Sequence, residues 1–442
     1  MPDRVRFSAW ASAWALATFL FSAPGAAQTS APATEAQAPT IPSMPRITLG
    51  QAIQRALAQN SSIVVALEEI RRAEALVREA RAASLPALTG NGVYTHQGID
   101  ENRSIGGRVI LARDQLQANV TLSVPLIVPQ KWAQWSHAST AVSATRAAGE
   151  EVKRQTAVAV ARAFLTVISQ KHVVDVNEHA LKTAKAHFDY AHTRFLGGVG
   201  NRVDDVRAEQ QVAANQSQLE TSYSALARAR EALGILLSDS GPIDAVEEIA
   251  LPAAPTLATA LDESTSRRAD VVTGKRRLDA AEEVKKDSYA DYLPFLMGNV
   301  QGYYQTPEGF TPQLGWLAQL VLTVPFYDGG LRYGLGAERE SLAVEARSQY
   351  ESILRQARSD VRVAFESVKH AEAALASAVG AARLARSALE LANVAYRAGA
   401  TTNLEVIDAE RAAHAADTAA AVAEDQAGQA RIDLLAASGR FP

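Results

Sequence analysis

The chain is a tandem repeat, and this feature constrains its fold more than any other. Thr48 to Asn91 aligns without gaps on Thr256 to Asn299. Within these segments the motif LPAL recurs as LPFL, and further along the motif LSVPL recurs as LTVPF. Self-similarity on this scale indicates two copies of one structural unit, so the fold must build the same arrangement twice.

The repeat sets the predicted organisation of the chain. Residues 47–240 form the first predicted repeat and residues 256–438 the second, joined by a linker rich in Gly and Pro over 241–255. Each repeat is predicted to run helix, strand, loop, strand, very long helix, turn and helix. This places β-hairpins at about 87–125 and 295–325, and long helices over 129–237 and 331–438.

The N-terminus has the pattern of a secretory signal peptide. Arg4 and Arg6 precede the apolar stretch Ala9 to Phe21, and small residues stand before Gln28, which predicts a signal peptide over 1–27. An uncleaved anchor is the alternative. Residues 28–46 are predicted to be a flexible leader. Beyond the signal no apolar run reaches 18 residues, so no transmembrane helix is expected in the mature chain.

Two segments alternate apolar and polar residues as membrane strands do. The alternation covers Leu116 to Pro125 and recurs over Trp316 to Val324. About ten residues is the length of a membrane β-strand whose apolar face meets lipid. An ordinary soluble two-sided sheet has the same period, so it is the alternative interpretation of this pattern. Four strands cannot close a barrel, and open edges cannot face lipid. If these strands span a membrane, several chains must therefore share one barrel, and three chains would give twelve strands.

Aromatic residues cluster near the ends of these predicted strands. Such clusters are typical of the two aromatic girdles that flank the apolar band of a membrane barrel. The predicted girdle residues are Trp132, Trp135, Phe326 and Tyr327 near one end, and Tyr303, Tyr304 and Trp316 near the other.

Heptad repeats predict very long helices. From Leu331 to Tyr396 there is no proline, and a seven-residue apolar repeat runs from Leu354 to Tyr396 beside an alanine repeat from Ala357 to Ala392. A looser copy runs from Val160 to Phe195. Some 66 residues of helix span on the order of 100 Å, which suits a tube better than a globular domain.

Each long helix is predicted to end in a glycine turn that leads into an acidic helix start. Gly198 and Gly399 suit the left-handed end of a helix. Asn201 is predicted to cap the next helix in the first repeat, and Thr402 with Glu405 matches a capping box in the second.

The acids after the turns, Asp204, Asp205, Glu405 and Asp408, allow two interpretations. They cap a helix and favour its positive end, or they line the narrow tip of a tube. Glu405 and Asp408 are three residues apart and share a helix face, so threefold symmetry would make rings of six carboxylates that favour cations. The two roles are equally supported for Glu405, whereas capping does not explain Asp408.

The repeat, the strand motif ending in Val-Pro and the turn YRAGATTNLEVIDAE together resemble the TolC family of outer-membrane factors. The resemblance covers nearly all of Ile47 to Ser438. It implies a mainly α fold with membrane β-hairpins: a long α-helical coiled-coil barrel plus four β-strands per protomer. A homotrimer would then form a twelve-stranded β-barrel and a periplasmic α-barrel.

The resemblance also implies a function and a location. The chain would be a passive exit duct in the outer membrane of a Gram-negative bacterium, in contact with outer-membrane lipid and extending into the periplasm. Its partners would be a periplasmic adaptor (membrane fusion) protein and an inner-membrane pump of a tripartite efflux or type I secretion system. Glu405 and Asp408 would form the selectivity ring, and Asp204 with Tyr396 a gate link. The chain departs from the family at Thr401, where an arginine is expected.

Other functions lack their motifs in this sequence. There is no HExxH, GxGxxG, GxxxxGK or GxSxG motif, so no catalytic residue, cofactor site or metal site is predicted, and the chain is not expected to be an enzyme. A net charge of −4 gives no basic patch for nucleic acid. The alternative is a periplasmic coiled-coil scaffold or adaptor outside the membrane, which explains the heptads but not the strands. The cargo, whether drug, metal, solvent or protein, stays open.

Overall fold

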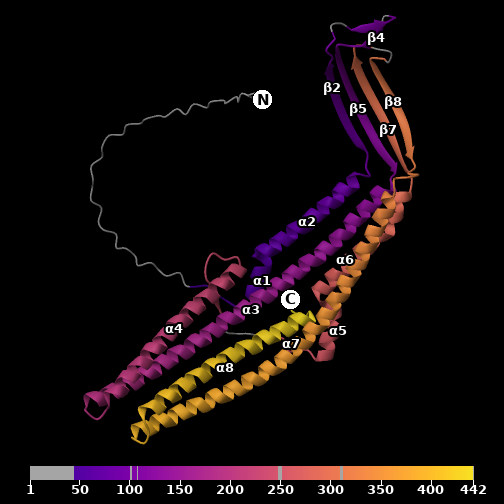
Figure 1. The fold of residues 1–442 in the computed structure, drawn as a ribbon. Coiled ribbons are helices and arrows are strands. Elements are labelled where there is room, and N and C mark those ends of the chain that lie inside the picture. Colours follow the sequence, from indigo (N-terminus) through magenta and orange to yellow (C-terminus); the bar gives the residue numbers. More distant parts are fainter. Residues whose placement is uncertain (1–43, 100–101, 107, 247–250, 309–311, 442) are drawn as a thin grey trace, which may run out of the picture. The chain divides into compact units, whose positions relative to one another are not determined.

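A computed structural model describes residues 44–441, apart from 100–101, 107, 247–250 and 309–311. The signal peptide predicted for 1–27, most of the leader predicted for 28–46 and part of the 241–255 linker lie outside these described residues. Long helices and one long-stranded sheet make up most of the rest, as Figure 1 shows.

The principal sheet has four antiparallel strands in the order β2-β5-β7-β8. Each is long enough to cross a bilayer when tilted. The outer strands β2 and β8 each pair on one side only within the described chain, so the sheet has two open edges. The strand bounds are β2 (Ala87–His96), β5 (Asp114–Ile127), β7 (Phe295–Thr306) and β8 (Leu314–Thr323).

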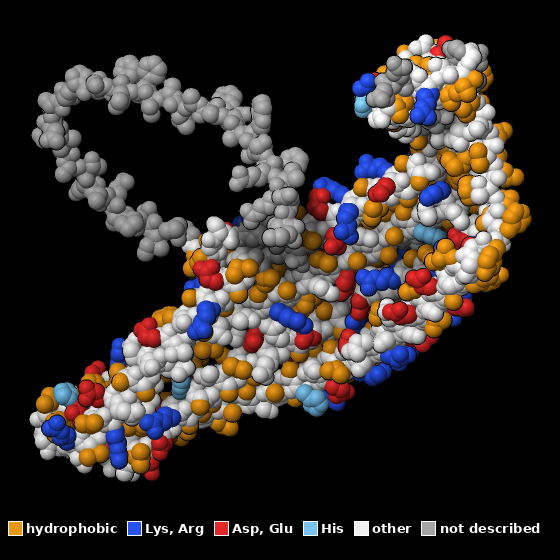
Figure 2. All heavy atoms as spheres, turned by 45° about the horizontal axis from the view of Figure 1, so that its top comes forward, with side chains coloured by type: hydrophobic (Ala, Val, Ile, Leu, Met, Phe, Trp, Pro, Cys, Tyr) orange, Lys and Arg blue, Asp and Glu red, His pale blue; other side chains and the backbone are white. Residues whose placement is uncertain are grey.

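The two faces of this sheet differ in polarity. Apolar residues on one face are exposed, with Leu88 70%, Trp316 76% and Leu320 73% accessible. The opposite face carries polar residues such as Asn91, which donates to the Asn119 side chain at 3.3 Å. Figure 2 shows hydrophobic side chains gathered along the strands, while charged ones are scattered over the helices. An apolar face this exposed requires a cover of lipid or protein.

Two helical hairpins follow the strands. The hairpin of α3 (Pro129–Leu196) and α4 (Arg202–Leu236) comes directly after β5, and that of α7 (Leu331–Arg397) and α8 (Asn403–Ser438) comes after β8. Within each hairpin the two helices lie side by side (Figure 1). At 68 and 67 residues, α3 and α7 are each about 100 Å long.

The heptad positions face the packed side of these helices. Val361 and Val368 on the apolar repeat and Ala357 and Ala364 on the alanine repeat are buried in α7. Val160 and the next three members of the looser repeat are buried in α3. Small residues at a packed seam let helix axes approach closely, which the sequence pattern predicted.

Shorter elements pack against the long helices. Glutamine and threonine cap α1 reciprocally, because Thr48 accepts from the Gln51 N–H and the Gln51 side chain accepts from the Thr48 N–H. These elements are α1 (Leu49–Gln59), α2 (Ser61–Ala82), α5 (Leu257–Arg267), α6 (Ala269–Lys286), the 3-10 helix η1 (Asp287–Tyr292) and the sheet of β1 (Arg46–Ile47) with β6 (Asp244–Ala245). The small hairpin of β3 (Arg103–Ile105) with β4 (Arg108–Leu111) lies instead at the end of the strands away from the helices (Figure 1).

The predicted combination of long helices with four long strands is therefore confirmed. One helix, α3, does contain a stretch apolar and long enough to cross a membrane by composition. Half of that stretch is buried inside the protein, where α3 packs on α1, α2, α4 and α8. Its apolar character is therefore explained by core packing.

Candidate functional site at the helix tips

The turns that end the two hairpins have the predicted backbone. Gly198 and Gly399 both adopt φ of +74°, in the left-handed region that favours glycine. Asn201 caps α4, because its side-chain oxygen accepts from the Val203 N–H at 3.1 Å. These three predicted roles are confirmed.

The predicted capping box at α8 is wrong. Thr402 is the N-cap by backbone conformation, but its hydroxyl makes no capping hydrogen bond, and the Glu405 side chain is exposed. The start of α8 is held instead by Asn403. The Nδ2 of that side chain donates to the Asp204 carbonyl at 3.2 Å, so α8 is tied to α4 rather than capped locally.

Asn403 also joins the second hairpin to the first through His187. The buried imidazole of His187 in α3 donates from Nε2 to the Asn403 side-chain oxygen at 2.6 Å. Burial lowers the pKa of His187 and outweighs the opposing effects of Asn403 and Asp204. A neutral imidazole is thus favoured at this junction, and one amide side chain links three helices.

Tyr396 lies at the centre of an aromatic cluster at the tip. Its ring centroid lies 5.5 Å from that of His187 and 5.7 Å from that of Tyr190. The Arg194 guanidinium stands 5.4 Å from the Tyr396 ring centroid. Burial raises the pKa of Tyr396, against the lowering effect of Arg194. The tip therefore holds a cation on aromatic faces, supplied by α3, although Thr401 stands where the family arginine was expected.

Asp204 and Tyr396, predicted to form a gate link, line one cavity of about 490 Å³ between the two turns. No hydrogen bond joins their side chains in the described structure. Thr401 lines the same cavity, and its buried hydroxyl has no partner. The structure brings the predicted pair together around a cavity but leaves the direct link a prediction.

The other predicted acids divide by exposure. Glu405 and Asp408 are both exposed on α8, and neither takes part in a hydrogen bond or ion pair within the described residues. Asp205 is mostly covered and accepts from His192 Nδ1 at 2.9 Å. Asp205 thus fixes its own hairpin, while the pair on α8 is free to meet ions. Their place in a ring stays a prediction.

Most of the predicted girdle residues are exposed near strand ends. Trp132 and Trp135 follow β5 at 45% and 37% exposure, and Phe326 and Tyr327 follow β8 at 89% and 87%. Trp316 and Tyr304 lie on the apolar face near the far end of β7 and β8.

Tyr303 departs from the girdle prediction. The register pairs it with Asn119 and Gly315, which places it on the polar face of the sheet. A Cβ on Gly315 would collide with the Tyr303 hydroxyl, so the tyrosine ring covers the glycine. Successive residues of a strand point to opposite faces of the sheet, so Tyr303 and Tyr304 cannot lie on the same face. The sequence alone could have predicted this difference.

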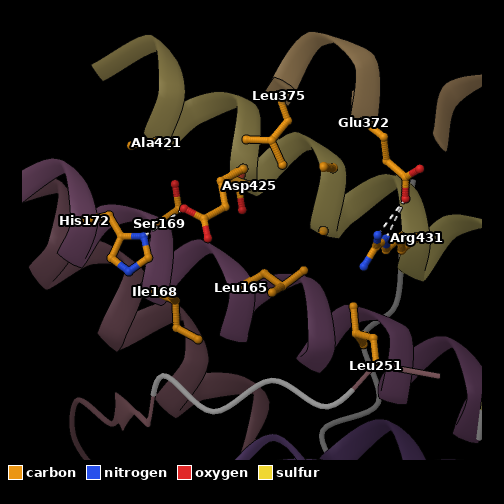
Figure 3. A pocket seen from close by; sticks show the side chains of 13 residues that line it. Leu165, Ile168, Ser169, His172, Leu251, Glu372, Leu375, Ala421, Asp425 and Arg431 are labelled. Carbon is orange, nitrogen blue, oxygen red and sulfur yellow. Dashed lines mark hydrogen bonds and ion pairs between the residues drawn. The ribbon is translucent and has the colours of Figure 1, made fainter. Parts of the chain in front are cut away.

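A second cavity, of about 340 Å³, opens between α3, α7 and α8 further from the tips (Figure 3). Leu165 and Ile168 of α3 form an apolar wall, while Glu372 and Arg431 are ion-paired at 2.7 Å. Burial raises the pKa of Asp425. No motif or repeat in the sequence marks the residues of this cavity.

Sequence reasoning also missed a polar layer two turns above the tip, around Glu410. This side chain is 7% exposed, and both of its carboxylate oxygens lack a hydrogen-bond partner. Burial raises its pKa to about 7. Glu410 aligns with exposed Glu209 in the first repeat, so the repeat alone did not mark it as buried.

Across the residues that the structure describes, no three His, Cys, Asp or Glu side chains lie close enough to hold a metal ion. What the tips offer is a hydrogen-bonded junction of two hairpins, with exposed carboxylates beside it.

Comparison with known proteins gives one family. The profile of the outer membrane efflux protein family matches residues 52–238 and 260–440, one segment in each repeat. Fusaric acid resistance protein FusA of Burkholderia cepacia is 27% identical over 61% of the chain, an alignment that spans about half, 53%, of FusA. Toluene efflux pump outer membrane protein TtgC of Pseudomonas putida is 23% identical over 82% of the chain and 77% of TtgC.

Solved structures share the fold. The outer membrane protein VceC from Vibrio cholerae superposes with a TM-score of 0.74 at 19% identity, over 88% of this chain and 96% of VceC.

Proposed function

The chain belongs to the outer membrane efflux protein family, and we propose that it is the exit duct of an efflux system, built from three copies around one tunnel. The family places it in the outer membrane of a Gram-negative bacterium. The observation that carries the proposal is the four-stranded sheet with two open edges and an exposed apolar face.

Open edges and lipid are incompatible, because unpaired N–H and C=O groups cannot be satisfied in hydrocarbon. Strands β2 and β8 run in opposite directions, since each neighbouring pair in the sheet is antiparallel. The β8 edge of one copy can therefore pair antiparallel with the β2 edge of the next. Three copies give twelve strands, and the apolar face then meets lipid around the whole barrel.

The helical hairpins continue this assembly into the periplasm. Exposed apolar residues remain on α7, including Leu384 at 62% and Leu391 at 70%, and on α4, including Val206 at 51%. Such residues suit contact between copies in a tube of helices. The tips would lie at the far end of the tube, where Glu405 and Asp408 from three copies form acidic rings.

The family supports a proposal for the partners and for the class of cargo. A passive exit duct needs an energised pump in the inner membrane and a periplasmic adaptor to reach it. FusA and TtgC are named for fusaric acid and toluene, both small organic molecules. We therefore propose small organic compounds as the cargo class, and the pump and adaptor choose among them.

Deletion and rescue test the duct. A strain that lacks the gene should become sensitive to small organic toxicants, and the wild-type gene should restore resistance. The purified protein should also conduct ions across a planar lipid bilayer. A protein that fractionates as soluble and never conducts would instead be the periplasmic scaffold.

A further inference from the structure

Glu410 is a buried acid without a counter-ion at the place where the two hairpins meet. It stands in α8 with 7% of its surface exposed, and neither carboxylate oxygen has a hydrogen-bond partner. A buried carboxylate anion without a partner is strongly disfavoured, whereas the neutral acid is tolerated. The packing seen here is therefore that of the protonated side chain.

Four helices supply the surroundings of Glu410. A cavity of about 40 Å³ lies beside it. The charged and titratable groups that face this cavity are His179 of α3, Arg386 of α7, and His414 and Asp417 of α8, while α4 supplies the neutral Asn215.

None of these groups neutralises the carboxylate. The Arg386 Nε donates to Asp417 at 2.7 Å, and His414 Nε2 donates to the Asn177 side-chain oxygen at 2.7 Å. The described residues hold no cluster of three donors for a metal ion. A proton is the ligand that fits this site.

The same layer ties the hairpins together. The Nε of Arg411 in α8 donates to the Gln211 side chain of α4 at 2.9 Å, and Gln211 donates to Asn215 at 3.1 Å. Asn215 donates in turn to the Ala180 carbonyl of α3 at 3.1 Å. With the His414 contact to α3, this chain of bonds links α8 to both helices of the first hairpin. Glu410 shares its cavity with Asn215 of this chain of bonds, so a change of charge at Glu410 acts on the junction of the hairpins.

We propose that Glu410 is a proton-binding latch between the hairpins: the protonated acid lets α8 pack on α3 and α4, and ionisation drives the layer to separate and take up water. This inference rests on the proposed function, because separation of the hairpins would widen the lower end of the tunnel. The duct would thus pass into its open form more readily as the pH rises.

The sign follows from linkage. Burial raises the pKa of Glu410 from 4.5 to about 7. Because the pKa is raised in the packed state, the stabilisation of the packed hairpins is fully present below pH 4.5 and is lost as the pH rises through 7. Between these values the equilibrium constant for packing falls roughly tenfold per pH unit. Burial lowers the pKa of His414, so protonation of His414 opposes the latch only in acid. The change expected from Glu410 between pH 6 and pH 8 is on the order of tenfold, and the Glu410→Gln variant separates it from any effect of His179, which faces the same cavity.

Amide hydrogen exchange of the purified full-length assembly in detergent tests the latch directly. Protection factors, corrected for the intrinsic effect of pH, should fall about tenfold in the first turns of α8 and in the facing turns of α3 between pH 6 and pH 8. Glu410→Gln should remove this fall and keep protection high. Glu209→Gln, the matched control at the exposed repeat position, should behave as wild type. An equal fall in Glu410→Gln would overturn the latch.

A second measurement needs no variant. In infrared difference spectra, the unmodified protein should show a protonated carboxyl band that disappears with a midpoint near pH 7, and absence of such a band at pH 6 would refute the assignment. Bilayer conductance separates the two proposals. If the protein never conducts, the duct is refuted. If amide exchange responds to pH but conductance is equal at pH 6 and pH 8, the step from latch to tunnel is refuted.

Discussion

The His187 imidazole of α3 donates a hydrogen bond of 2.6 Å to the side chain of Asn403, the first residue of α8. Through Nδ2, Asn403 also donates to the Asp204 carbonyl of α4. One buried amide therefore holds the tips of two hairpins that are distant in sequence. If the tips must part for cargo to pass, this bond must break.

Asn403→Ala should loosen the tip. The change removes both hydrogen bonds and leaves the buried His187 donor unpaired, at a cost of about 1–3 kcal/mol. We expect higher basal conductance in bilayers and faster amide exchange at the start of α8. Thr402→Ala is the matched control, because the neighbouring hydroxyl makes no capping bond. Equal effects of the two changes would show that Asn403 has no special role.

Asp408→Asn should weaken block of the channel by multivalent cations. Threefold symmetry would place three Asp408 and three Glu405 carboxylates near one axis, and the substitution halves that charge. We expect affinity for a trivalent blocker to fall on the order of tenfold in single-channel recordings. Asp408→Glu keeps the charge and should keep the block. Unchanged block in Asp408→Asn would contradict the assignment of Asp408 to an acidic ring.

Asp244→Asn should destabilise the start of the described chain. The Asp244 carboxylate is buried and contacts Arg230 at 2.9 Å, Arg46 at 3.4 Å and Lys171 at 3.8 Å, which fixes β1 beside β6. Loss of its charge should lower the free energy of unfolding in detergent by roughly 2–3 kcal/mol.

The more exposed pair of Asp239 with Arg55 gives the control for this prediction, since the Asp239 side chain is 22% exposed and that of Asp244 is 3% exposed. Asp239→Asn should cost less than about 1 kcal/mol, because surface ion pairs contribute little. If denaturant titrations give both variants the same stability, the cluster around Asp244 does not anchor the strand.

The sequence predicted those parts of the fold that repeat with a short period. Heptads marked the buried side of α7, and alternation marked the two faces of β5 and β8, because each period corresponds to one backbone geometry. Glycine also predicted the turns correctly, since a φ of +74° at Gly198 and Gly399 is costly for other residues.

The contacts between hairpins could not be predicted in this way. Glu410 and Glu405 both lie in an alanine-rich helix, and only the packing of α3 and α4 on α8 makes one buried and the other exposed. The capping box at Thr402 failed for a similar reason, because Asn403 bonds across to another helix. Tertiary contacts overrule local patterns at such junctions.

Disulfide cross-linking of the open strand edges tests the shared barrel most directly, and the absence of native cysteine makes it clean. Asn91→Cys in β2 would be combined, one at a time, with cysteine at alternate positions of β8 from Gly315 to Val321, which lie on the same face. We predict that one register gives covalent dimers and trimers and nothing larger, since a third copy closes the ring. Monomers alone at every register, or a ladder that continues beyond three, would contradict the trimeric duct.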